Sequence, residues 1–116
     1  MMARALIAGL VVAVAGFGTS AAMAADEKAG EAIYAKQCVT CHGKSGAGDG
    51  PAAAKLKDKP KNWTAGGLKE YDDAKIAEIT KKGGKAVGKS AAMPPYAKLS
   101  DPELDNVVAY VKTLAK

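Results

Sequence analysis

The chain has 116 residues, a formal net charge of +5 and only six aromatic residues. This length allows a single domain that buries only a modest core. Two cysteines and one histidine are too few for a zinc site of four cysteine or histidine ligands, and no glycine motif has the spacing of a phosphate-binding loop.

Residues 1–24 have the pattern of a cleavable signal peptide. Arg4 gives a positive start, residues 5–17 are apolar or glycine, and Ala22-Met23-Ala24 fits the small-x-small motif at which such peptides are cut. The alternative is an uncleaved anchor, because residues 5–25 carry no charge and are nearly long enough to span a bilayer. The small residues before the cut favour cleavage, so we expect export without membrane insertion of the mature chain.

Cleavage after Ala24 would leave residues 25–116 as one domain. This domain contains 16 lysines, no arginine and 12 acidic residues, a formal charge of +4. We expect it to be all-α, because the pattern predicts helices with start and stop signals and no convincing strand. The three main helices are expected over residues 26–37, over residues 72–82, and from a cap at Ser100 onward. Loops are expected over residues 43–51, 57–67 and 84–99, with a short helical piece over 51–56.

The last helix is the clearest element in the sequence. Ser100 and Glu103 have the spacing of a capping box, in which each side chain binds the backbone of the other residue. Apolar residues then follow on one helical face, and we expect this face to pack against the helix over residues 26–37. They are Leu104, Val107, Val108, Val111 and Leu114. In the helix over residues 72–82, Asp72 is expected to be the N-cap, with Ile76 and Ile79 pointing inward.

Cys38, Cys41 and His42 form a C-x-x-C-H motif, which is typical of covalent haem attachment. Each thiol can add to one vinyl group of the same porphyrin, and the imidazole that follows can become an axial ligand of the iron. Three other uses of a C-x-x-C pair are weaker. A dithiol redox site needs a βαβ context, a zinc site needs further ligands, and so short a disulfide stabilises little.

Met93 is the candidate for the second axial ligand of the iron. It is the only methionine of the mature chain and the chain has no second histidine. A thioether is a soft neutral ligand that raises the reduction potential, and Pro94 and Pro95 stiffen the loop beside it. A lone methionine more commonly fills a core. A lysine amine or an open site with water are the alternatives to Met93 as a ligand.

Together these residues resemble the class I cytochromes c, which are small monohaem electron carriers with histidine and methionine ligands. Gly30 and Tyr34 stand before the C-x-x-C-H motif as in that family's first helix, and Met93-Pro94-Pro95-Tyr96 precedes the last helix. The likeness covers essentially all of residues 25–116. It implies an all-α cytochrome c fold, with three main helices and loops around one covalently bound haem c, and a close crossing of the first and last helices at Gly30.

The resemblance also implies contacts beyond the four haem-binding residues. The backbone carbonyl of Pro51 would accept a hydrogen bond from Nδ1 of His42, which fixes the ring and raises its donor strength. Asn62 or Trp63 would donate to a haem propionate, and plain core packing is an equal alternative for Trp63.

The function implied by the resemblance is one-electron transfer in the bacterial periplasm, as in a respiratory chain, by a monomer that is not an enzyme. Lysines at 55, 57, 59 and 61 and at 81, 82, 85 and 89 would attract redox partner proteins with acidic docking surfaces, although solvated surface explains them equally well. Nucleic acid is not an expected partner of an exported chain. One alternative is a tightly bound electron-transfer subunit of a periplasmic dehydrogenase or oxidase complex. A gas-binding or peroxidase-like haem protein is weaker, because the mature chain offers no distal histidine or arginine.

Overall fold

The computed structural model describes residue 9 and residues 24–116, so the predicted signal peptide falls almost wholly outside the described residues. All the regular elements of the described part are helical, which confirms the expected fold class. The α-helices are α1 (Glu27–Gln37), α2 (Val39–His42), α3 (Asp73–Lys82) and α4 (Asp101–Leu114). Three single turns of 3₁₀-helix lie in segments that the sequence predicts to be loops or a short helical piece. They are η1 (Ala53–Lys55), η2 (Trp63–Ala65) and η3 (Lys85–Val87).

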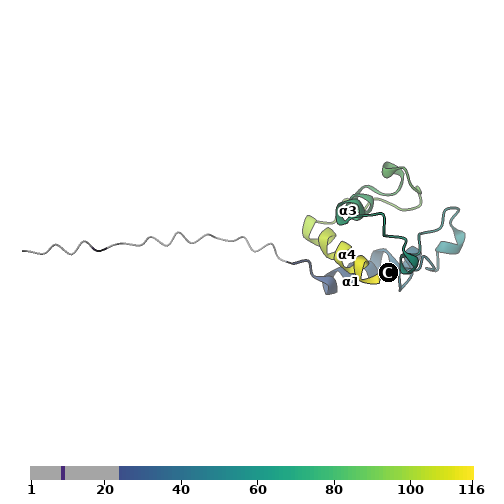
Figure 1. Ribbon diagram of the computed structural model, residues 1–116. Helices are drawn as coiled ribbons and strands as arrows, with labels where there is room; N and C mark the ends of the chain where they lie inside the picture. Colours follow the sequence, from purple (N-terminus) through teal and green to yellow (C-terminus); the bar gives the residue numbers. More distant parts are fainter. Residues whose placement is uncertain (1–8, 10–23) are drawn as a thin grey trace, which may run out of the picture.

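Helices α1 and α4 form the main pair of the fold and lie side by side in Figure 1, with α3 packed on α4. They cross at Gly30, which is buried. A Cβ atom at this position would lie 2.5 Å from the carbonyl carbon of Asn106 and 3.0 Å from Cβ of Tyr110. A second contact ties the start of α1 to the same turn, since the backbone N–H of Asp26 donates to Oδ1 of Asn106 at 2.8 Å. Glycine therefore allows the two backbones to approach as the sequence predicts.

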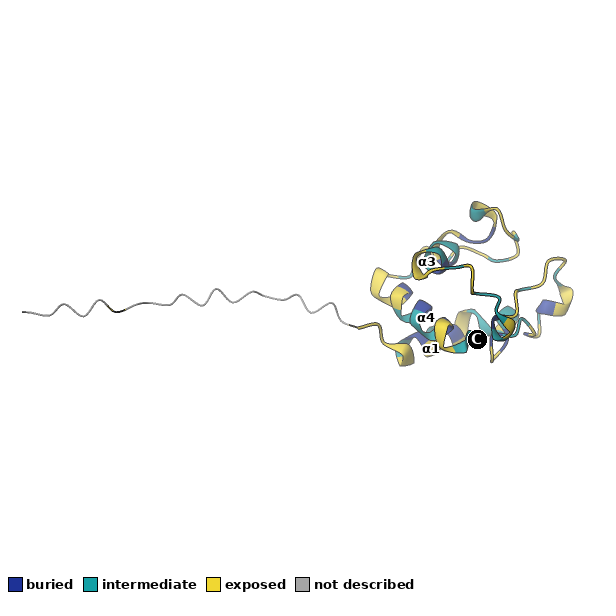
Figure 2. Cartoon of the chain, viewed as in Figure 1, coloured by how far each residue is buried: buried dark blue, intermediate teal, exposed yellow. Residues whose placement is uncertain are grey.

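Helix α4 begins with the predicted capping box. The Ser100 hydroxyl accepts from the backbone N–H of Glu103 at 3.2 Å, and the Glu103 carboxylate accepts from the backbone N–H of Ser100 at 3.0 Å. The first four members of the predicted apolar face are buried, and Leu114 at the end of the helix is half-buried. Figure 2 shows α4 beside α1, with buried and exposed stretches along the helix. Val107 and Val111 of the buried face also line the cavity described below.

Helix α3 follows its predicted N-cap, because the Asp72 carboxylate accepts from the backbone N–H of Lys75 at 2.8 Å. Ile76 is buried as expected. Ile79 also points inward as expected, since it is half-buried and lines the cavity described below. Thr80 is the second buried residue of the helix. The Thr80 hydroxyl is tolerated there because it donates to the backbone carbonyl of Ile76 at 2.8 Å.

The core centres on Tyr34, whose exposed fraction is 1%. Its ring lies 5.3 Å from that of Tyr110 and 6.2 Å from that of Trp63, and its hydroxyl donates to the backbone carbonyl of Gly43. This cluster joins α1 and α4 to the segments on either side of the C-x-x-C-H motif. Over the described part of the chain, every helix is too short or too polar to cross a membrane.

Candidate functional site

The three residues of the C-x-x-C-H motif occupy one turn at the junction of α1 and α2. The backbone N–H of Cys38 still bonds to the carbonyl of Tyr34 at 2.9 Å, and the carbonyl of Cys38 accepts from the N–H of His42 at 2.9 Å. Cys38 is the C-cap of α1 and the N-cap of α2, and the turn of α2 places Cys41 on the same side as Cys38. The motif is therefore held by the backbone of the α1 helix, which is anchored in the core by Tyr34.

A single cavity of about 280 Å³ contains all four sequence-predicted ligands in its lining. Cys38, Cys41 and His42 contribute from one side, and Met93 contributes from the loop before α4. The remaining wall is largely aliphatic and aromatic, and it comes from several elements of the fold. It includes Leu56, Trp63, Ile76, Ile79, Val107 and Val111.

The imidazole of His42 is the orphaned polar group of this cavity. Its Nδ1 atom is buried, and among the described residues it has no hydrogen-bond partner. The ring stacks on Trp63 with centroids 4.5 Å apart and planes inclined by 20°. Burial lowers the pKa of His42, so the imidazole is neutral and its lone pair is free to bind a metal. The predicted bond from Nδ1 to the Pro51 carbonyl is not formed in this structure.

Cys38 and Cys41 are not joined in a disulfide, and both are half-buried. Burial raises the pKa of the Cys38 thiol to about 11, with a smaller contribution from a negative charge on Cys41. Cys38 is therefore protonated at neutral pH, and it presents an S–H group rather than a thiolate to the cavity.

The loop that carries Met93 is fixed at several points. The backbone carbonyl of Met93 accepts from the N–H of Gly84 at 3.0 Å, and the N–H of Tyr96 donates to the carbonyl of Thr80 at 3.0 Å. The Tyr96 hydroxyl donates at 2.9 Å to the carbonyl of Gln37, the last residue of α1. This bond, across 59 positions of sequence, ties the Met93 loop to the residue before Cys38.

Asn62 and Trp63 have structural roles beside the cavity. The Asn62 carboxamide oxygen caps η2, since it accepts from the backbone N–H and the hydroxyl of Thr64 at 3.0 and 2.6 Å. Trp63 is both a core residue and a cavity residue. The expected donation of either side chain to a haem propionate stays a prediction.

Lys61, Tyr71 and Lys89 form a polar group at the cavity. The sequence points to the two lysines only as surface charges, and it does not indicate that Tyr71 lies between them. Lys89 donates to the Tyr71 hydroxyl at 2.5 Å, and the ammonium group of Lys61 lies 4.9 Å from the centre of the same ring. These residues come from three separate segments and follow no helical or strand period. The only sign of this group in the sequence is that each of its two lysines belongs to a run of lysines.

The chain is similar to known proteins over most of its length. It matches the family model "Cytochrome C oxidase, cbb3-type, subunit III" over residues 25–111. It is 36% identical to cytochrome c-554(547) of Halothiobacillus neapolitanus over 94 residues, which cover 78% of this chain and 99% of that protein. It is 32% identical to cytochrome c6 of a Picosynechococcus species over 111 residues, 92% of this chain and 88% of that protein. The cbb3-type cytochrome c oxidase subunit FixPc of Rhizobium leguminosarum is 36% identical over 83 residues, 71% of this chain but 28% of that protein.

Proposed function

The chain belongs to the monohaem cytochrome c family of electron carriers, and we propose that it binds its haem iron through His42 and Met93. The family implies one covalently attached haem c, and the relatives are electron carriers rather than enzymes. The observation that carries the proposal is the common cavity. It brings Met93 to the same space as Cys38, Cys41 and His42, although Met93 lies far from them in the sequence.

The residues of this cavity fit a haem. Two thiols stand on one turn at the spacing that covalent attachment needs, and the next residue is a buried imidazole with an orphaned nitrogen. The aliphatic wall matches an apolar porphyrin, whose burial would add the core volume that so short a chain lacks.

Four residues of the cavity would hold the haem. Cys38 and Cys41 anchor the group by thioether bonds, and His42 presents a neutral imidazole. Met93 would present a thioether sulfur, which favours ferrous iron and would keep other ligands from the iron. When bound, the haem supplies an iron that alternates between the ferrous and ferric states. The apolar walls exclude water from that centre.

We further propose that the chain is exported to the periplasm after cleavage behind Ala24 and acts there as a monomeric carrier between redox proteins. The eight lysines of the two predicted clusters are all exposed. Lys81 and Lys82 are each paired with a carboxylate at 3.8 Å, so the remaining six supply most of the positive field for acidic partners.

A second candidate is a bound electron-transfer subunit of an oxidase complex. Two findings favour it over a gas-binding or peroxidase-like protein: the matching family model is named for subunit III of a cbb3-type oxidase, and FixPc is a subunit of such an oxidase. The chain spans little more than a quarter of FixPc, so this assembly is a proposal. Co-purification of the chain with membrane oxidase from its own host separates the subunit from the free carrier.

The test of Met93 compares two substitutions. Met93→Leu keeps an apolar side chain of similar size and removes the sulfur, whereas Met93→Ala also leaves a gap. Sulfur bonded to ferric haem gives a weak absorption band in the far red, and we expect both variants to lose it, to have lower reduction potentials and to bind carbon monoxide or cyanide readily. Ser90→Ala, in the same loop, is the control and should retain the band. If Met93→Leu keeps the band and the potential, another residue is the ligand.

A further inference from the structure

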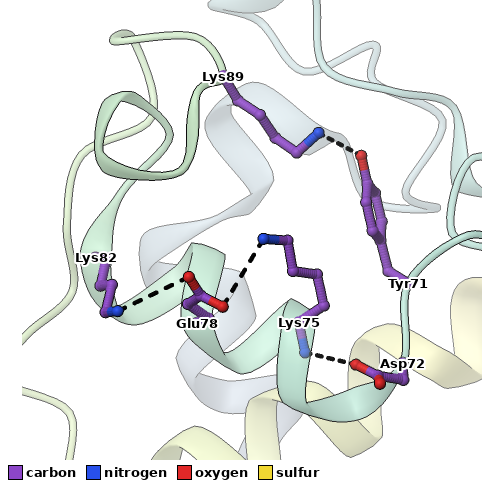
Figure 3. A network of polar contacts seen from close by, with 6 residues as sticks. All are labelled: Tyr71, Asp72, Lys75, Glu78, Lys82 and Lys89. Carbon is purple, nitrogen blue, oxygen red and sulfur yellow. Dashed lines mark hydrogen bonds and ion pairs between the residues drawn. The ribbon is translucent and has the colours of Figure 1, made fainter.

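Two ammonium groups converge on one phenol at the wall of the cavity. Lys89 Nζ donates a hydrogen bond of 2.5 Å to the Tyr71 hydroxyl (Figure 3). The same Nζ lies 4.8 Å from the centre of the Tyr71 ring. Lys61 Nζ lies 4.9 Å from the centre of that same ring. All three residues line the cavity that contains Met93 and His42. We call Lys61, Tyr71 and Lys89 the rim cluster.

The rim cluster has an excess of positive charge. Among the described residues, neither Lys61 nor Lys89 forms an ion pair, and Asp58, the carboxylate in the cavity lining, pairs with neither. Other lysines on the same side of the molecule do have partners. Figure 3 shows Lys75 and Lys82 sharing the Glu78 carboxylate, each at 3.8 Å.

Two like charges brought to one small group repel each other unless an anion lies between them. The Tyr71 hydroxyl offers only an oxygen acceptor and one donor, which does not neutralise two ammonium groups. The three side chains together present several N–H and O–H donors to one small volume, which is the donor set that carboxylate groups bind.

We infer that the rim cluster is a carboxylate-binding site, and that the carboxylates it holds are the propionate side chains of the haem. This inference rests on the proposed haem-binding function. The propionates are the charged part of an otherwise apolar group, so they must leave the aliphatic cavity where cations can meet them. The rim cluster supplies two cations and one hydroxyl from three separate segments, and Lys89 lies only four residues before Met93.

The test is the reduction potential of the holoprotein and its dependence on pH. Lys61→Gln and Lys89→Gln each remove one charge from the rim cluster, and Lys85→Gln removes the same charge from an exposed residue outside the cavity lining. Without a neutralising ammonium, the propionate charge favours ferric iron. For charges about 10 Å apart at an effective dielectric constant between 20 and 80, we expect the equilibrium constant for reduction to fall roughly two- to sixteenfold. A tenfold change is about 59 mV for one electron.

Three further results are expected. The pH at which the potential changes slope rises in both rim variants, because a carboxylate that loses a cation binds its proton more tightly. The infrared carboxylate bands of propionates labelled with carbon-13 shift in the same variants and in Tyr71→Phe. The effects of Lys61→Gln and Lys89→Gln are not additive in the double variant, since both act on one group. If Lys85→Gln matches the rim variants in potential and infrared bands, the inference is wrong.

A free carboxylate from solution is the other source of the same chemistry, and succinate is the probe that distinguishes it. At constant ionic strength, we expect succinate to leave the wild-type potential unchanged because the propionates already fill the site. A saturable change with succinate that disappears in the double variant would overturn the propionate assignment. Absence of the far-red band from the wild type and every variant would instead contradict Met93 ligation. The difference in reduction potential between the rim variants and Lys85→Gln would still test the rim cluster in that case.

Discussion

Replacing Gly30 by alanine tests whether the crossing of α1 and α4 depends on a bare backbone. Two effects of this change have opposite signs. Alanine is the better helix former, which alone would stabilise the chain by about 1 kcal/mol. Against this, the new methyl group would lie 2.5 Å from the backbone carbonyl carbon of Asn106, while ordinary contact begins at 3.4 Å. The neighbour is backbone, so it cannot turn away as a flexible side chain can.

The carbonyl oxygen of Asn106 lies nearer still, so the methyl group forces the two helices apart by more than the roughly 0.9 Å that contact with the carbon alone requires. A shift of this size loosens Tyr34 and Val107, the two most deeply buried large side chains. Overpacking of a core costs about 1–3 kcal/mol, and contact with rigid backbone places Gly30→Ala at the upper end of that range. After the gain in helix preference, we expect a net loss of about 2 kcal/mol. For a domain of this size that corresponds to a fall in Tm of roughly 8–16 °C.

Thermal unfolding of the haem-loaded protein, followed by helical circular dichroism, measures this shift. Ala35→Gly, at an exposed position of the same helix, is the matched control, because it changes only helix preference and should destabilise by about 1 kcal/mol. A rise in Tm for Gly30→Ala would refute the reasoning, since it would mean that helix preference outweighs the contact with Asn106.

Three other changes test the helix cap and the loop of Met93. Ser100→Ala should cost about 1 kcal/mol of unfolding free energy in denaturant titration, because the first turn of α4 loses its cap. The backbone N–H of Ser100 lowers the pKa of Glu103 below its usual 4.5, so this residue stabilises the fold above that pH and the stabilisation is lost as the pH falls through the lowered pKa. Glu103→Gln should therefore make unfolding less dependent on pH below about 4.5. Tyr96→Phe should speed cyanide binding in stopped-flow mixing, because the loop of Met93 loses its bond to Gln37; an unchanged rate would contradict a fastening role for that bond.

Local patterns account for the features that the sequence predicts correctly. The capping box of α4 and its apolar face depend on residues within a few positions of each other, and so does the Asp72 cap of α3. The close crossing of the two helices at Gly30 is predicted only by the family resemblance, because nothing in the sequence of α1 shows that Asn106 lies against Gly30. The burial of Thr80, which the sequence does not indicate, also has a physical basis. A threonine hydroxyl that bonds within its own helix needs no outside partner.

The polar surroundings of the cavity could not be predicted from the sequence. Tyr71 and Lys89 are separated by 18 positions and a helix, and Tyr96 reaches Gln37 across 59 positions. The two residues of such a pair are not a helical or strand repeat apart in the sequence. The path of the irregular loops between them decides whether they meet. Their contacts emerge only when α3 and the Met93 loop are packed around the cavity.

The intact mass of the protein exported by its own host tests the central claim most directly. We expect the mass of residues 25–116 with one haem added, and the haem should stay with the polypeptide after extraction with acidified acetone. Cys38→Ala together with Cys41→Ala should release the pigment under the same extraction. A wild-type mass without haem, with two free thiols and a pigment that extracts, would contradict covalent attachment at Cys38 and Cys41.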